Sequence, residues 1–225
     1  MDFAIIYFGL TRSTKKVFFT HIHKIINVLK KNNLTYKIFM HTWNIKDNTQ
    51  NILGKVIRHK IDYTEYTLLN PDVYKIESQD DFINSINVDK FFYKSEWGPL
   101  LIKNHICALE SMKRGLEMVE DSKEEFKHIM FLRPDVMIRN ELPIDKILLH
   151  PDKISIPNDN HWEGYNDRFA VMNYKNACIY GKRINELEEF LKNERITSEK
   201  YVKFIINKYK IPVNLIDFNF EIARP

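Results

Sequence analysis

The chain alternates short apolar runs with longer segments in which apolar residues recur every three or four positions. Residues 3–8 form an uncharged run that ends at Gly9, which is typical of a strand covered on both faces. Residues 15–31 then show helical spacing, and residues 36–40 form a second apolar run. This β-α-β order predicts an α/β fold with a central, mostly parallel sheet flanked by helices.

The rest of the sequence continues this alternation after an Asn/Asp-rich stretch that extends to Asp72. Residues 56–61 are a candidate third strand, and Ser78 with Asp81 predicts the start of a short helix. Gly98 and Pro99 predict the start of a long helix that extends to Val119. The further predictions are strands at 128–132, 153–156, 169–172 and 213–216, and helices at 174–192 and 198–209.

Length and composition predict a single domain spanning residues 1–225, because 44% of the 225 residues are hydrophobic and no linker or repeat interrupts the chain. The net charge is +4, and the lysines are spread along the sequence, so we expect no nucleic-acid partner. The absence of a basic leader and of an apolar run of roughly 20 residues predicts no integral membrane segment. A cytoplasmic protein is expected, in the host cytoplasm if viral, and its oligomeric state is open.

The turn after the first predicted strand is a candidate nucleotide-binding loop. Gly9 permits a close approach of the backbone, Thr11 and Ser13 offer hydroxyl groups, and Arg12 can pair bidentately with a phosphate. The amino end of the following helix also favours anions. The segment matches no established glycine-rich phosphate motif, and an ordinary turn with an exposed arginine is the competing interpretation.

A second candidate follows the apolar run 128–132, where Arg133 and Asp135 flank Pro134. Ligands of open α/β sheets bind beyond the carboxyl ends of the strands, which is where this tripeptide is expected. The Asp135 carboxylate is a candidate ligand for Mn²⁺ or Mg²⁺, which would neutralise a departing diphosphate. An Arg/Asp pair that only closes a turn is the alternative.

A third candidate is the polar and aromatic segment 158–168, which precedes the predicted strand 169–172. Its acids are candidate general bases for an acceptor hydroxyl, with Asp167 preferred over Glu163 and Asp159. Its rings are candidate contacts for the acceptor sugar: His161, Trp162 and Tyr165. The alternative is a solvated loop with a tryptophan packed in the core.

Three further residues are weaker candidates for donor binding. His41 and Trp43 follow the second predicted strand, and Trp43 could stack on a base, although core packing is an equally good interpretation. Lys103, near the start of the long helix, could reach the donor. His105 lies on the apolar stripe of that helix, which favours a structural role.

Together these residues resemble the GT-A glycosyltransferases, in particular the small viral and bacterial sugar transferases that decorate capsids or capsular polysaccharides. The resemblance spans most of the chain and depends on the order of four segments, which are Gly9 with Arg12, 41–43, 132–135 and 166–170. It implies a D-x-D motif in which Asp135 is the last acid and holds a divalent metal, while Arg133 replaces the first acid. An arginine can itself neutralise a diphosphate, so this replacement argues against a strict need for the metal.

The resulting hypothesis is transfer of a sugar from a nucleoside diphosphate sugar, with uridine diphosphate expected, to a hydroxyl of a glycan or glycoprotein. A single general base and a single displacement step favour inversion of configuration at the anomeric carbon. The alternatives are a nucleotidyltransferase and a nucleotide- or glycan-binding module without catalytic activity. Pyrophosphate release would identify the first alternative, and binding without turnover the second.

Overall fold

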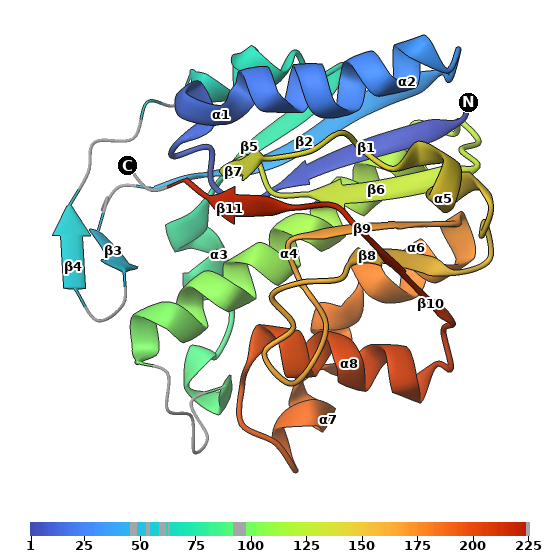
Figure 1. Cartoon of the computed structure of the whole chain (residues 1–225). Coiled ribbons are helices and arrows are strands. Elements are labelled where there is room, and N and C mark those ends of the chain that lie inside the picture. The colour runs from blue at the N-terminus through green and yellow to red at the C-terminus, as the bar shows by residue number, and fades with distance from the viewer. Residues whose placement is uncertain (46–48, 53–54, 59–61, 63, 92–97, 224–225) are drawn as a thin grey trace.

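A computed structural model describes residues 1–45, 49–52, 55–58, 62, 64–91 and 98–223. A seven-stranded sheet with the order β10-β8-β9-β6-β1-β2-β5 forms the centre of this part of the chain (Figure 1). Its strands are β1 Phe3–Phe8, β2 Tyr36–Asn44, β5 Val73–Ser78, β6 His128–Leu132, β8 Ile154–Pro157, β9 Phe169–Met172 and β10 Val213–Ile216. All neighbouring strands are parallel except β9, which runs antiparallel to β6 and β8. The predicted α/β class with a mostly parallel sheet is therefore confirmed.

Helices cover both faces of this sheet (Figure 1). One face carries α1 Thr14–His21, the π-helical turn η1 Ile22–Ile26 and α2 Asn27–Lys31, which follow one another without a break. The other face carries α4 Pro99–Asp121, α6 Tyr174–Gly181 and α8 Ser198–Lys208. Within the described residues, no helix combines the length and the apolar character that crossing a bilayer requires.

The alternation of side chains along β1 explains why both faces need a cover. Phe3, Ile5 and Tyr7 pack with the α1–α2 layer, whereas Ala4, Ile6 and Phe8 pack with the α4 layer. Since all six residues are buried, the strand contributes apolar contacts to two cores at once. At Gly115 of α4 a Cβ atom would lie 2.4 Å from Ile6 Cγ2, so this glycine lets the helix approach the strand.

The structure departs from the sequence-based assignment mainly at exposed or short elements. β5 was not predicted, because as the edge strand it carries a half-exposed Tyr74 and the polar residues Lys75 and Glu77. The candidate strand 56–61 overlaps β4 Lys55–Arg58, which pairs with β3 Thr49–Ile52 outside the central sheet, while 59–61 lie outside the described residues. The expected helix 174–192 is interrupted after α6 by the 3₁₀ turn η4 Arg183–Glu186 and continues as α7 Leu187–Leu191.

Other short elements complete the fold. The predicted short helix is α3 Gln79–Ser85, and its N-cap Ser78 accepts a hydrogen bond from the Asp81 amide. β7 Val136–Ile138 pairs antiparallel with β11 Phe220–Ile222, and neither strand was predicted. The remaining unpredicted elements are η2 Glu65–Leu69, η3 Val88–Phe91 and α5 Ile144–Leu148.

Candidate functional site

A cleft of about 290 Å³ opens where β1, β2 and β6 end. The residues after these strands form one wall, the first turns of α4 form another, and the start of α8 closes the third side. Within the described residues, its lining consists of Phe8, Gly9, Leu10, Arg12, Trp43, Gln79, Leu101, Asn104, His105, Cys107, Ala108, Arg133, Asp167, Arg168, Ser198, Glu199 and Ile222. This position matches the general rule that ligands of α/β sheets bind beyond the carboxyl ends of the strands.

Arg12 and Arg133 reach this cleft from two different strands and share Asp135 as their partner. Arg133 donates from Nε to Asp135 Oδ1 at 2.9 Å and from Nη2 to Oδ2 at 2.7 Å. Arg12 donates from Nε to Oδ2 at 3.2 Å, and its Nη2 lies 3.1 Å from the same oxygen. Two guanidinium groups on one carboxylate leave a net positive charge beside the cleft, which suits an anionic ligand.

The backbone around Asp135 explains how the cluster is held. The Arg133 amide donates to the Arg168 carbonyl, and the Ala223 amide donates to the Asp135 carbonyl at 2.8 Å. Thr14, at the start of α1, donates from its hydroxyl to the Pro134 carbonyl at 3.5 Å. The segment is therefore tied to β9, to the C-terminal strand and to α1, so the arginines project from a fixed base.

Burial and the charge of Asp135 have opposite effects on the pKa values of Arg12 and Arg133. Burial lowers the pKa of Arg12, and the charge of Asp135 opposes that effect. At Arg133 burial also acts to lower the pKa, but the charge and hydrogen bonds of Asp135 outweigh it and raise the pKa. Both guanidinium groups stay protonated at neutral pH, because an arginine starts from a pKa above about 12.

The residues at Asp135 do not fit the divalent cation that the D-x-D resemblance implies. Both carboxylate oxygens already accept hydrogen bonds from guanidinium groups, and the side chain is only 1% exposed. In the described ranges, no group of three or more His, Cys, Asp or Glu side chains is arranged to hold a metal. A hard cation needs several free oxygen ligands, and two neighbouring positive charges oppose its binding. No step proposed below involves a metal.

Asp167 and Glu199 contribute two carboxyl groups to the lining of the same cleft. Arg168 lies between them, with Nε 3.7 Å from Asp167 Oδ1 and Nη2 3.5 Å from Glu199 Oε1. Ser198 donates to Glu199 Oε2 at 2.9 Å, whereas Asp167 Oδ1 is buried and accepts no hydrogen bond from the described residues. Because Asp167 lines the cleft, its carboxylate is a candidate proton acceptor for a hydroxyl bound there.

Glu199 is the more perturbed of these two acids. Burial, followed by the negative charge of Asp167, raises its pKa above the ordinary value for glutamate. The folded protein therefore holds this proton more tightly than the unfolded chain does. Stability falls as the pH rises through the raised pKa, because the unfolded state then releases the proton more readily.

Replacing Glu199 with glutamine should therefore raise the free energy of unfolding more at pH 8 than at pH 5. We expect a higher free energy of unfolding at pH 8 and little change at pH 5, because the neutral amide has no charge to desolvate. Urea unfolding at both pH values measures the effect. The exposed Glu194→Gln is the matched control, and a Glu199→Gln curve as flat as that of the control would contradict the assignment.

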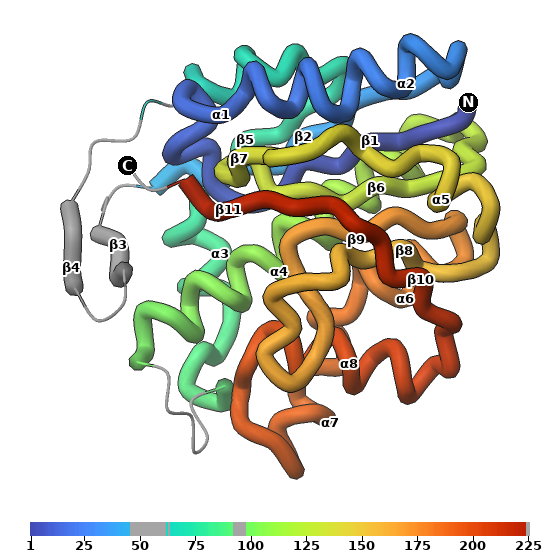
Figure 2. The backbone as a smooth tube through the Cα atoms, viewed as in Figure 1, coloured from blue at the N-terminus to red at the C-terminus, as the bar shows by residue number. Residues whose placement is uncertain are grey.

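The loop 158–168 between β8 and β9 is fixed against the start of α8 (Figure 2). The Tyr165 amide donates to the Glu199 carbonyl at 3.0 Å. A Cβ atom at Gly164 would lie 1.9 Å from that same carbonyl oxygen, so only glycine permits this contact. The docking of this loop sets the distance between Asp167 and Glu199.

The structure brings together only some of the residues that the sequence indicated. Of the candidates for donor binding, those lining the cleft are Gly9, Arg12, Trp43 and Arg133, with Asp135 directly behind the arginines. Thr11 and Ser13 are buried within the turn, and Lys103 lies within 3.9 Å of Asp80. None of these three belongs to the described lining of the cleft.

Among the candidates in the loop 158–168, only Asp167 lines the cleft. Glu163 is exposed and forms an ion pair with Lys200. Trp162 is 70% exposed, so it is not packed in the core as the alternative interpretation held. Asp159, His161 and Tyr165 lie outside the described lining, and the ring of His161 contacts Tyr165 edge to face.

His41 and Trp43 were expected after the second strand, but β2 continues to Asn44 and contains both residues. His41 is buried, and Nδ1 hydrogen-bonds with the Ser111 hydroxyl at 2.8 Å. Trp43 donates from Nε1 to the Cys107 carbonyl at 2.9 Å and stacks on Phe82. These partners are those of core residues, and only Trp43 also contributes to the cleft wall.

Several residues of the cleft were not singled out in the sequence as ligand contacts: Gln79, Asn104, Arg168, Ser198 and Glu199. Glu199 follows Ser198 in the first turn of α8, where an acid is expected simply because it complements the helix dipole. Asn104 and His105 lie on α4 next to apolar positions. Their role depends on where the helix docks, which local sequence does not reveal.

No protein-family model and no curated protein sequence matches the chain. Among solved structures, it is similar to mouse xyloside xylosyltransferase 1 in its apo form, with a TM-score of 0.42 and 8% identity over 96% of this chain and 84% of that one. It is also similar to the galactosyltransferase LgtC in complex with donor and acceptor sugar analogues, with a TM-score of 0.47 and 10% identity over 95% and 73% of the two chains. Both of these proteins are glycosyltransferases.

Proposed function

We propose that the protein transfers a sugar from a nucleoside diphosphate sugar to a hydroxyl group of a glycan or glycoprotein. The observation that carries this proposal is the pair of guanidinium groups on Asp135 in a cleft whose lining also contains the carboxyl groups of Asp167 and Glu199. A diphosphate requires positive charge, and an acceptor hydroxyl requires a proton acceptor. The cleft supplies both within a volume suited to part of a ligand of this kind.

In this proposal Arg12 and Arg133 bind the diphosphate and stabilise the negative charge that grows on it as the bond to the sugar breaks. The acceptor oxygen forms its bond to the anomeric carbon while Asp167 takes the hydroxyl proton. The electron pair of the broken bond stays on the departing diphosphate. An inverting course agrees with one base and one step, and uridine diphosphate is the nucleotide we expect.

Incubation with a panel of nucleoside diphosphate sugars tests the activity. We expect slow release of free nucleoside diphosphate from one or a few donors. Chromatography of the products measures this release. Release of pyrophosphate would instead identify a nucleotidyltransferase, and saturable binding without any release would identify a binding module. Either of these outcomes contradicts the proposed transfer.

Asp167→Asn should reduce the turnover rate at least about 100-fold, in line with the loss of a general base. Donor affinity should change little, because the arginines that would bind the diphosphate are untouched. Calorimetry with uridine diphosphate and a steady-state assay separate the two quantities. Glu163→Gln is the matched control, since this exposed side chain is paired with Lys200 on the surface. Equal turnover in both variants would remove Asp167 from the reaction.

A further inference from the structure

The positive charge of this protein is concentrated near its beginning. Residues 3–46 contain eight lysines and arginines but no aspartate or glutamate. With 34 basic and 30 acidic residues in the whole chain, the remainder therefore carries a net charge of −4. Such an asymmetry indicates interaction with a negatively charged surface.

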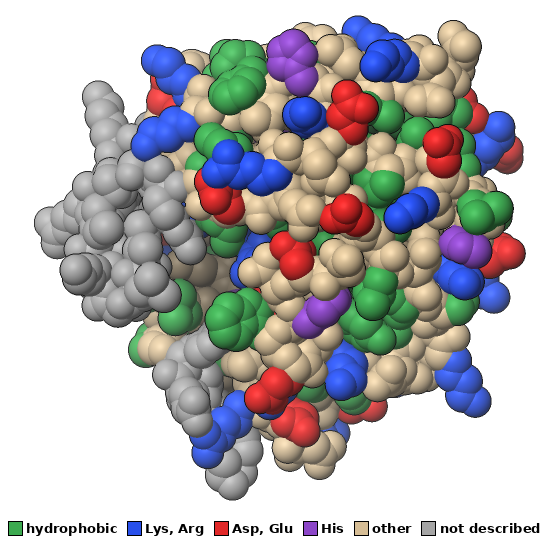
Figure 3. Space-filling model, viewed as in Figure 1, with side chains coloured by type: hydrophobic (Ala, Val, Ile, Leu, Met, Phe, Trp, Pro, Cys, Tyr) green, Lys and Arg blue, Asp and Glu red, His purple; other side chains and the backbone are tan. Residues whose placement is uncertain are grey.

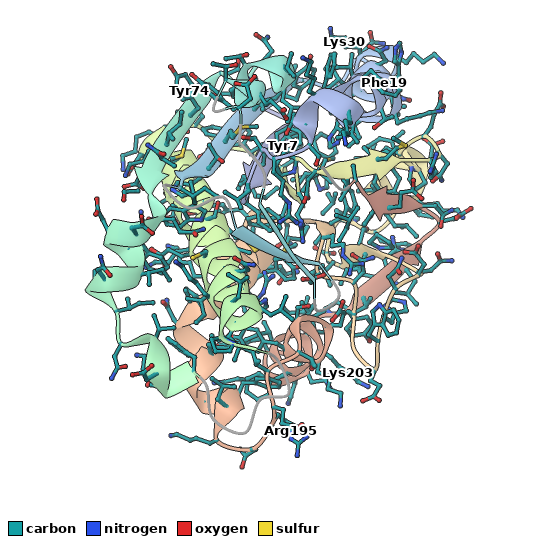
Figure 4. The ribbon with its side chains drawn as sticks, turned by 90° about the vertical axis from the view of Figure 1, so that its left-hand side faces the viewer. Tyr7, Phe19, Lys30, Tyr74, Arg195 and Lys203 are labelled. Atoms are coloured by element: carbon teal, nitrogen blue, oxygen red, sulfur yellow. The ribbon has the colours of Figure 1, made fainter. Side chains whose placement is uncertain are left out.

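The fold places most of this charge on one surface. The outer face of α1, η1 and α2 exposes Lys15, Lys16, His23, Lys30 and Lys31. In Figure 3 the region over these helices, at the top of the view, carries several basic side chains, and Figure 4 shows Lys30 at the upper rim. We call this surface, defined by Lys15, Lys16, His23, Lys30 and Lys31, the basic face.

A hydrophobic ring lies within the basic face. Phe19 is 48% exposed although it belongs to a regular helix whose other face is buried. It lines a shallow groove of about 770 Å³ together with His23, Lys24, Lys30, Lys31 and one exposed acid, Glu141. An exposed phenylalanine surrounded by lysines combines the two features of a segment that lies at a membrane interface.

The helix dipole accounts for part of this charge, because Lys30 and Lys31 lie in the last turn of α2, where the dipole favours cations. Lys15 and Lys16 occupy the first turn of α1, where the helix dipole disfavours cations, and the Glu65 carboxylate accepts a hydrogen bond from the Lys15 amide there at 2.9 Å. Within the described part of the chain, Lys24, Lys30 and Lys31 form no ion pair with a carboxylate. Exposed lysines on one surface repel one another in the free protein, and a negatively charged partner relieves that repulsion.

We propose that the basic face docks on the surface of a bilayer that contains anionic lipids, with Phe19 entering the boundary between headgroups and acyl chains. A flat, charged surface contacts one face of the molecule only, which matches a charge confined to one helical layer. A nucleic acid that contacts several faces of the protein would be repelled by the rest of the chain, which carries a net negative charge. The inference is independent of the reaction in the cleft.

Sedimentation with vesicles tests this docking. We expect binding to vesicles of phosphatidylcholine mixed with phosphatidylserine, little binding to phosphatidylcholine alone, and weaker binding as salt is raised. Lys30→Glu with Lys31→Glu should weaken binding roughly tenfold or more, because each basic residue near a charged bilayer contributes several-fold to affinity. Phe19→Ser should weaken it several-fold even at low salt.

The matched control is Lys175→Glu with Lys203→Glu, which changes the net charge equally at exposed positions on α6 and α8. Figure 4 shows Lys203 at the lower end of the molecule, far from Phe19 and Lys30. Circular dichroism verifies that every variant is folded. Equal binding to both kinds of vesicle, equal losses in both double variants, or tight binding to duplex DNA without vesicle binding would overturn the proposal.

Discussion

Replacing Asp135 with asparagine is expected to lower both the stability of the protein and its affinity for uridine diphosphate. The carboxylate is buried and neutralises two guanidinium groups, so its loss leaves two like charges side by side in a poorly hydrated place. Breaking a buried ion pair in this way costs about 3 kcal/mol of unfolding free energy. Affinity for the diphosphate should fall at least about tenfold because the arginines are no longer held in position.

Urea unfolding and calorimetry with uridine diphosphate measure these two losses. Asp152→Asn is the matched control, since that aspartate is exposed and its loss changes the net charge equally. Adding Arg12→Met to Asp135→Asn should restore part of the stability, because the repulsion between the guanidinium groups disappears. If Asp135 served only as a metal ligand, the metal-free variant would unfold like the native protein, and that result would refute the role assigned here.

Acidification from pH 7 to pH 4 should destabilise the protein by several kcal/mol, with buried histidines as a principal cause. Burial lowers the pKa of His21, His41 and His105 to about 4. Between their ordinary value of about 6.5 and about 4, the unfolded chain binds more protons than the folded one, so stability falls as the pH falls. A shift of this size corresponds to about 3 kcal/mol for each histidine.

His21 illustrates why protonation is costly. Its Nε2 donates to the Val136 carbonyl at 2.7 Å, and its Nδ1 hydrogen-bonds with the Tyr7 hydroxyl at 3.2 Å, so the neutral ring is already satisfied. At His41 burial outweighs the opposing effect of Glu77, whose carboxylate lies 3.0 Å from Nε2.

Urea unfolding at a series of pH values measures the predicted loss. His21→Gln should flatten the curve between pH 4 and 6.5, while the exposed His23→Gln should leave it unchanged. A native stability that is constant across this window would contradict the neutral state of the buried histidines.

Much of the central fold could be predicted because the deciding information is local. The continuous apolar character of residues 3–8 and 128–132 requires burial on both faces, and β1 and β6 lie side by side in the centre of the sheet. The start of α4 at Pro99 and the cap of α3 at Ser78 also follow from neighbouring residues. The edge strand β5 could not be recognised, since an exposed edge needs no apolar pattern.

The candidate site was predictable only in part. Gly9, Arg12 and Arg133 follow buried strands, and their position in the cleft follows from the geometry of parallel sheets. The residues of loop 158–168 could not be separated in advance, because all of them are polar or aromatic and the docking of Gly164 on Glu199 decides which of them faces the cleft. Glu199 itself looks like an ordinary acid at a helix start.

Local sequence was thus sufficient for the buried strands and the long helices of the central layers, for the faces that they bury, and for the charged residues that follow the strands. Only the tertiary structure decided that Asp135 binds Arg12, which lies 123 positions earlier in the chain, and that Asp167 meets Glu199. The physical reason is that apolar periodicity depends on neighbours along the chain. The ionisation and the partners of a charged side chain depend instead on the groups that folding brings within a few ångströms of it.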